Sequence, residues 1–289
     1  MKYTTSKSSD DSEYESEGGT TYRWENAKKI IGQGKYAYAR RFISPFSGKT
    51  KAVLSPNEKE KEKIDFSEAQ NKFCFFNALH PKQCHLVKLE NTYRLVLPEV
   101  PGKLYRHYKE SFITKVQQAE FFLSAVRALK KAHDAKIIVM DLHEKNIFFE
   151  DESKVSYLID GGLSHCSQAP LTGVFKCDTQ SELEYKKVKY KQLPPECWHL
   201  KIHSVLAAPT MDIYSLGTMM ERMLGFYIHP QIKQLAVLCQ QENPVKRPTL
   251  STLEEQLTHL LTEHTIEQVL KIVLEEEDSS GHHNRSCHL

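Results

Sequence analysis

The sequence has little net charge, no long apolar run and no paired cysteine motif, and each absence excludes a class of protein. Lysine and arginine total 39 and aspartate and glutamate total 37, which gives a formal net charge of +2. This balance argues against a nucleic-acid binder that works through bulk positive charge. No apolar run approaches the ~20 residues that a membrane-spanning helix needs. The N-terminal residues also lack the apolar core of a secretory signal. We therefore expect no membrane span and no nucleic-acid partner.

The seven cysteines are scattered, and no two of them stand in a Cys-x-x-Cys arrangement. This usage predicts reduced thiols in a cytoplasmic compartment rather than a disulfide framework. The C-terminal sequence HHNRSCHL offers possible metal ligands in His282, His283, Cys287 and His288. Nothing near them fixes a geometry, so a frayed polar terminus is the preferred interpretation.

Composition divides the chain into four segments. Residues 1–23 are rich in Ser, Asp, Glu, Gly and Thr and are expected to be disordered, because they contain too few large apolar side chains to offset the entropy of ordering. Residues 24–98 contain short apolar runs typical of strands. Residues 99–264 are mainly helical. Residues 265–289 are expected to form a C-terminal helix and a disordered tail.

Two amphipathic helices are the clearest periodic segments. Apolar residues recur at three- and four-residue spacing from Phe66 to Leu79 and again over residues 113–133. Further helices are expected over residues 211–224, 231–240, 250–261 and 266–276. The predicted fold class is therefore α+β, with a small β-rich N-lobe that contains one main helix and a larger α-helical C-lobe.

Three oxygen-bearing side chains indicate where chemistry takes place. Asp141 follows a long predicted helix, Asn146 stands five residues later, and Asp160 follows a short apolar strand. Carboxylate and amide oxygens suit Mg²⁺ or Mn²⁺ held against phosphates. Gly32 and Gly34 lie between two predicted strands, where glycines allow backbone N–H groups to approach phosphates. Alone, that glycine pair would be read as an ordinary hairpin turn.

With these motifs the sequence resembles the eukaryotic-type protein kinase family, from about residue 28 to residue 261. Pro194-Pro195-Glu196 is similar to the family's Ala-Pro-Glu, and residues 212–217 resemble the buried helix start that anchors the catalytic loop. In the family an arginine pairs with that glutamate, which here joins Arg247 to Glu196. The resemblance implies a two-lobed kinase fold and ATP-dependent phosphoryl transfer to Ser or Thr hydroxyls of protein substrates, with Mg²⁺ or Mn²⁺.

The resemblance also implies roles for the residues of the catalytic loop. Asp141 would orient the substrate hydroxyl and accept its proton, and Asn146 and Asp160 would hold the metal ions. His143 stands in the place of a lysine that contacts the transferred phosphoryl group. It would act when protonated, or Lys145 would substitute for it. A group of this kind favours Ser/Thr over Tyr substrates.

The nucleotide would bind between the glycine loop and the hinge. Gly32 and Gly34 would cover the phosphates, and Ala52 matches the alanine of the family's Val-Ala-Ile-Lys strand. The hinge would bind adenine through the backbone of Pro98 and Val100. Only a carbonyl is needed at the first of these positions, so proline is compatible.

The sequence departs from the family at the strand lysine, where Leu54 stands. Lys51 lies three residues earlier and faces the opposite side of a regular strand, unless a bulge turns it. Arg41 and Lys35 are equally good candidates to replace the missing lysine. Glu68 is the best match for the helix glutamate that pairs with that lysine, although it could equally be a solvent-facing carboxylate.

The catalytic and activation segments also differ from the family pattern. Val139 and Met140 replace the usual His-Arg before Asp141, which predicts activity that does not depend on activation-loop phosphorylation. Gly161 replaces a phenylalanine and so removes an apolar anchor. A basic cluster follows that could dock an acidic or polyanionic partner, although a solvated loop is preferred; it comprises Lys186, Lys187, Lys189 and Lys191.

Three functions are compatible with these motifs, and an active Ser/Thr kinase is preferred because Asp141, Asn146 and Asp160 are all present. The chain could be an active but divergent Ser/Thr kinase, a pseudokinase that acts as a scaffold, or a kinase-fold enzyme that transfers a nucleotidyl group or phosphorylates a small molecule. The serine-rich acidic start and the acidic residues 275–278 resemble bacterial kinases secreted into host cells. The expected location is therefore the cytoplasm, or a host cell after translocation, and a solvated helix end is the alternative interpretation of the acidic residues.

Overall fold

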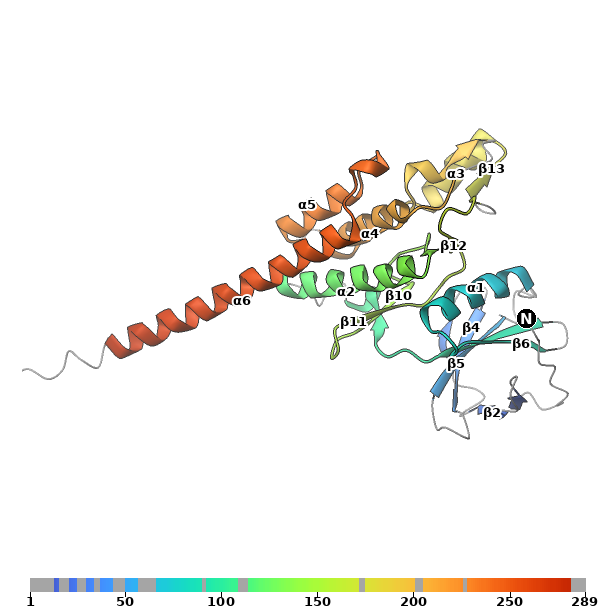
Figure 1. Cartoon of the computed structure of the whole chain (residues 1–289), viewed down its shortest axis with the longest axis horizontal. Helices are drawn as coiled ribbons and strands as arrows, with labels where there is room; N and C mark the ends of the chain where they lie inside the picture. Colours follow the sequence, from blue (N-terminus) through green and yellow to red (C-terminus); the bar gives the residue numbers. More distant parts are fainter. Residues whose placement is uncertain are drawn as a thin grey trace, which may run out of the picture.

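The computed structural model has a β-rich N-terminal lobe and a helical C-terminal lobe, as Figure 1 shows. This confirms the α+β, two-lobed fold class. The structure describes residues 13–15, 21–24, 30–33, 37–43, 50–56, 66–89, 92–108, 114–171, 175–200, 205–225 and 228–281. Within these ranges, no helix combines the length and apolar character that a bilayer crossing requires.

The N-lobe is built on a seven-stranded antiparallel sheet with the order β1-β2-β4-β5-β7-β6, and β3 pairs with β4. Its strands are β1 (Glu13–Glu15), β2 (Thr21–Trp24), β3 (Ile30–Gln33), β4 (Ala37–Ile43), β5 (Thr50–Pro56), β6 (His85–Leu89) and β7 (Thr92–Pro98). Helix α1 (Phe66–Leu79) packs on this sheet, because Phe76 and Leu79 share one apolar cluster with Leu95 and Leu97 of β7. The apolar side of α1 therefore faces the sheet.

The expectation of disorder over residues 1–23 is wrong for two segments. Strands β1 and β2 pair with each other, and β2 continues the sheet by pairing with β4 at Arg23↔Ile43 and Trp24↔Phe42. An edge strand satisfies its backbone groups by pairing and needs little apolar burial, so polar composition does not exclude it. The other residues of that segment lie outside the described ranges.

The C-lobe is mainly helical and carries several short strand pairs. Its elements are β8 (Lys103–Leu104), the 3-10 helix η2 (Tyr105–Tyr108), α2 (Lys115–Asp134), β9 (Ile137–Ile138), β10 (Ile147–Glu150), β11 (Val155–Leu158), β12 (His165–Cys166), β13 (Lys176–Cys177), α3 (Gln180–Lys189), η4 (Pro195–Cys197), β14 (His199–Leu200), α4 (Pro209–Leu224), α5 (Pro230–Cys239), η6 (Pro244–Lys246) and α6 (Leu250–Gly281). Thr114 begins α2 with a capping box closed by Gln117.

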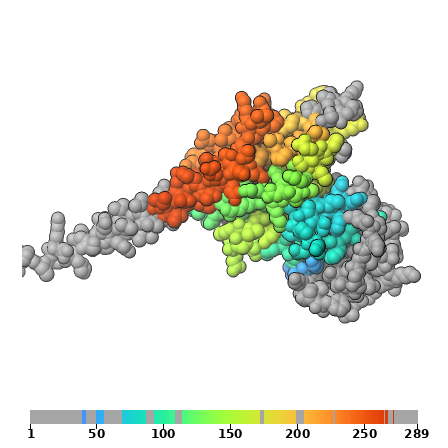
Figure 2. All heavy atoms as spheres, viewed as in Figure 1, coloured from blue at the N-terminus to red at the C-terminus, as the bar shows by residue number. Residues whose placement is uncertain are grey.

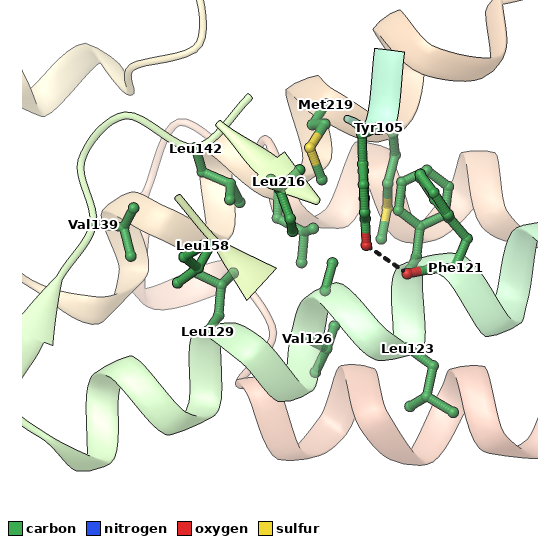
Figure 3. Close-up of a cluster of buried hydrophobic side chains, with 14 of the residues drawn as sticks. Tyr105, Phe121, Leu123, Val126, Leu129, Val139, Leu142, Leu158, Leu216 and Met219 are labelled. Carbon is green, nitrogen blue, oxygen red and sulfur yellow. Dashed lines mark hydrogen bonds between the residues drawn. The ribbon is translucent and has the colours of Figure 1, made fainter. Parts of the chain in front are cut away.

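The C-lobe core holds the β10–β11 hairpin against α2 and α4 (Figure 3). Tyr105 is fully buried there, and its hydroxyl donates a 2.9 Å hydrogen bond to the backbone carbonyl of Phe121. Burial raises the pKa of this phenol, so Tyr105 stays neutral and its polar end is satisfied. The core therefore gives the hairpin a rigid base, and the ends of that hairpin lead into the site.

Two helices differ from expectation. The polar segment after residue 160 contains α3, which begins at a Thr179 cap that accepts a hydrogen bond from the Glu182 N–H. The two helices expected over 250–261 and 266–276 are one continuous helix, α6, because no glycine or proline stands between them. The boundary expected at residues 264 and 265 thus lies inside α6, which extends away from the C-lobe in Figure 1. Residues 282–289, with their candidate metal ligands, lie outside the described ranges.

Candidate active site

Asp212, in the first turn of α4, fixes the backbone that leads into the predicted catalytic loop. Its buried carboxylate accepts hydrogen bonds of 2.8 Å from the N–H groups of Val139 and Met140, and it lies 2.9 Å from Nε2 of His133. Met140 adopts a positive φ of 63° directly before Asp141. Charge-assisted bonds to two successive amides hold this strained turn in place.

Asp141 receives a hydrogen bond on each carboxylate oxygen. Nδ2 of Asn146 donates to Oδ2 at 2.9 Å and to the Asp141 backbone carbonyl at 3.0 Å. Nε2 of Gln192 donates to Oδ1 at 2.9 Å. Gln192 is itself buried, and its backbone carbonyl accepts a 2.8 Å bond from the Ser215 hydroxyl. The carboxylate is therefore oriented from two sides.

His143 turns one ring nitrogen towards Asp141. Nδ1 accepts a 3.1 Å hydrogen bond from the Lys145 N–H, and Nε2 lies 3.5 Å from Asp141 Oδ1. Because Nδ1 is an acceptor, Nε2 carries the proton of the neutral ring. The structure thus brings His143 to Asp141, while Lys145 is exposed.

The β10–β11 hairpin brings Asp160 to Asn146. Ile147 pairs with Leu158, and the Ile159 N–H donates a 3.0 Å bond to the Asn146 carbonyl. Asp160 follows at once, with Oδ1 accepting a 2.8 Å bond from the Gly162 N–H. Residues fourteen positions apart therefore meet because an antiparallel hairpin closes between them.

This donor set fits a divalent cation. The Asn146 nitrogen is used by Asp141, so its side-chain oxygen is the atom able to ligate a metal, beside the Asp160 carboxylate. Oxygen ligands of this kind suit Mg²⁺ or Mn²⁺. In the described part of the chain, no three His, Cys, Asp or Glu side chains form a separate metal-binding group.

Arg247 and Glu196 form the ion pair that their motifs predict. The guanidinium is fully buried and contacts both carboxylate oxygens, with a 2.9 Å bond from Nη2 to Oε2. Nη1 also donates a 3.0 Å bond to the Thr210 carbonyl. The pair joins the end of the activation segment to the start of α4 and to the loop before α6.

A family model described as the protein kinase domain matches residues 25–271, which is most of the chain. The chain belongs to the protein kinase family. A search among curated proteins finds no match. Membership of this family indicates that the protein is a kinase, a type of transferase. The remaining geometry shows how this kinase differs from the usual pattern.

Gly161 stands where protein kinases usually carry a phenylalanine, and Phe75 of α1 occupies the vacated space. Both residues are buried. A Cβ added at Gly161 would lie 2.6 Å from the Phe75 Cβ and closer still to its ring. The phenylalanine side chain is absent at position 161, as the sequence indicates, and a ring from α1 lies against Gly161 instead.

Of the three candidates for the missing strand lysine, Lys51 and Arg41 lie in the described part of the chain. Strand β5 pairs with β7 in continuous register from Lys51↔Pro98 to Leu54↔Leu95, so no bulge turns Lys51. Its Nζ donates a 3.2 Å bond to the Gln83 carbonyl beyond α1. The structure does not bring Lys51 to the site, contrary to one of our expectations. Lys35 lies outside the described ranges, as does Gly34.

Arg41 shares a face of the sheet with Ala52, its cross-strand partner in β4–β5. Its guanidinium binds the hinge carboxylate of Glu99, with Nε 2.8 Å from both oxygens. In the structure Arg41 is therefore tied to the hinge by a charged pair, and its role as a phosphate ligand stays a prediction.

The remaining predicted binding residues lie in or beside the strands of the same sheet. Gly32 pairs with Ala39 beyond a register shift in β3, Pro98 ends β7, and Val100 follows it. Nothing in the structure assigns them a ligand. Glu68 lies in α1, but its side chain is outside the described residues.

The basic cluster lies on and just after α3. Lys186 Nζ contacts Glu182 and the Lys176 carbonyl, each at 2.7 Å, and Lys187 lies 3.4 Å from Glu184. These internal partners reduce the charge that is available to an acidic partner.

Sequence reasoning missed two residues that the structure places at the site, Gln192 and Lys72. Gln192 lies directly before the Leu-Pro-Pro-Glu segment, but nothing in that pattern signals a contact with Asp141. Lys72 lies in α1 with Cε 3.4 Å from the position of a Cβ on Gly162, and nothing in the sequence signals this approach.

Proposed function

We propose that this protein is an active Ser/Thr protein kinase that transfers the γ-phosphoryl group of ATP to hydroxyl groups of protein substrates. The observation that carries the proposal is the oriented Asp141 carboxylate beside Asn146 and Asp160. A scaffold has no need for a carboxylate held on both oxygens at the end of a rigid hairpin.

Asp141 is the proton acceptor in this proposal. Hydrogen bonds from Asn146 and Gln192 set the direction of its carboxylate, so that a substrate hydroxyl in reach would be aligned and deprotonated as transfer proceeds. Asn146 and Asp160 would hold Mg²⁺ or Mn²⁺, which would offset the charge of the phosphates, while ATP supplies the phosphoryl group. The Nε2–H of His143, next to Asp141, would steady the phosphoryl oxygens.

The structure supports independence from activation-loop phosphorylation. Met140, in the place of the family's arginine, is fully buried in an apolar cluster with Leu193 and Trp198. A phosphate on the activation loop would meet no cation at this position.

The test is transfer of label from γ-labelled ATP to a generic protein substrate, with Mg²⁺ and with Mn²⁺. We expect transfer by the wild type, loss of transfer in Asp141→Ala and Asp160→Ala, and full transfer by the exposed control Asp178→Ala. Metal-dependent ATP binding without any transfer to protein would contradict the proposal. Label transferred instead from α-labelled ATP would indicate nucleotidyl transfer.

A further inference from the structure

The site still needs a positive charge beside the phosphates. A triphosphate is held in protein kinases by metal ions and a lysine, and strand β5 carries Leu54 where that lysine would stand. Lys51 binds the Gln83 carbonyl and Arg41 binds Glu99, so neither is directed to Asp160. Among the described residues, a cation for the phosphates must therefore come from another element.

Lys72 stands on the packed side of α1. Ala69, three residues before it, and Phe76, four residues after it, are buried, and with the buried Leu79 they form the stripe that faces the rest of the molecule. Lys72 is half-buried within that stripe, whereas Asn71 is exposed. A lysine on such a face keeps its stem among apolar groups and brings its ammonium group to a polar site.

The polar site next to Lys72 is the Asp160-Gly161-Gly162 turn. A Cβ placed on Gly162 would lie 3.4 Å from Cε of Lys72, 4.0 Å from its Nζ and 3.2 Å from Oδ1 of Asp160. The ammonium and the carboxylate therefore border the same glycine. A larger residue at position 162 would crowd both groups.

Phe75 explains why α1 lies close enough. Its ring occupies the space above Gly161, so one turn of α1 is packed directly on the turn that carries Asp160. Lys72 and Phe75 are three residues apart and lie on neighbouring positions of one helix face. Position 161 lacks a phenylalanine and position 54 lacks a lysine. The same turn of α1 thus brings a ring to Gly161 and an ammonium group to the Asp160 turn.

We propose that Lys72 binds the nucleotide phosphates and replaces the strand lysine of other protein kinases. The ammonium reaches the phosphates from helix α1, beside Asp160, instead of from strand β5. This inference rests on the proposed function in taking ATP as the ligand.

The first test maps the phosphate-side lysine without any need for phosphoryl transfer. An acyl-phosphate derivative of ATP acylates a lysine next to the phosphates: the amine attacks the acyl carbonyl, an amide forms and ATP leaves. Mass spectrometry of the full chain after labelling should find the acyl group on Lys72, and excess Mg²⁺-ATP should prevent it. Labelling of Lys35 or Lys51 in its place, or of no lysine, would overturn the inference.

The second test removes the positive charge at position 72 and then introduces one at position 54. Lys72→Met should weaken binding of a fluorescent ATP analogue by ~10- to 100-fold, the range for loss of a charged hydrogen bond. Lys233→Met, on an exposed position of α5, should bind as the wild type does. Adding Leu54→Lys to Lys72→Met should recover part of the affinity, because that position shares the nucleotide face of β5 with Ala52.

The outcomes separate the two proposals. If the wild type transfers phosphate and Lys72→Met binds and transfers equally well, the inference fails and the kinase assignment stands. If the wild type transfers nothing, the proposed function fails, and the acylation pattern still decides the role of Lys72. A thermal unfolding midpoint of Lys72→Met close to that of the wild type confirms that lost binding reflects lost charge.

Discussion

Gly161 and Phe75 are complementary in size, so restoring the phenylalanine that kinases usually carry at position 161 should damage this protein. The backbone at Gly161 lies outside the left-handed region, so it tolerates a side chain by itself. The obstacle is Phe75, whose ring and Cβ already fill the space. A second ring at position 161 has nowhere to go unless α1 moves.

The magnitudes follow from packing. Overpacking a close-packed core typically costs ~1–3 kcal/mol, and Gly161→Phe should reach the upper end or exceed it because a whole ring is added. Phe75→Ala removes a fully buried ring, which costs ~3–5 kcal/mol. The double variant exchanges the ring between the two elements, and it should be more stable than the sum of the single changes by ~1–3 kcal/mol.

Urea unfolding of the four proteins measures this cycle. Additive effects of the two single changes, or a Gly161→Phe variant as stable as the wild type, would refute the claim that Phe75 fills the missing ring's place. Gly161→Ala is the milder version of the same change, and it should also destabilise, because its Cβ alone meets Phe75.

Three further predictions concern the catalytic carboxylate, the buried ion pair and the response to pH. Gln192→Ala removes one of the hydrogen bonds that orient Asp141, so kcat should fall about 10- to 100-fold while the KM for ATP changes little in steady-state assays. Arg247→Leu leaves the carboxylate of Glu196 without its buried partner and should lower the free energy of unfolding by ~3–5 kcal/mol in urea; an unchanged midpoint would contradict this. Burial, aided by two nearby lysines, lowers the pKa of His80 below its ordinary value, so the unfolded chain binds this proton more readily. The resulting stability is present above about pH 6.5 and is lost as the pH falls, and His80→Gln should reduce that loss in unfolding curves taken between pH 7.5 and 5.

The periodicity and the motifs of the sequence determined the fold class and the place of the site. Regular apolar spacing was sufficient for α1, α2 and α4, because an amphipathic helix must bury one side. Asp141, Asn146 and Asp160 were recognisable because a short hairpin brings them together, and local spacing encodes such a contact. The Arg247–Glu196 pair was predicted only because its motifs resemble those of the family.

The tertiary structure alone decided which side chains complete the site. Lys72, Phe75 and Gln192 reach Asp160, Gly161 and Asp141 from elements that are far away in the sequence, and no spacing rule links such residues. The sheet register likewise determined which face of the sheet Lys51 occupies, since one residue more or less in β5 would have turned its side chain to the other face. A missing side chain can be replaced from any element that packs against the same space, and packing between distant elements is a property of the folded chain.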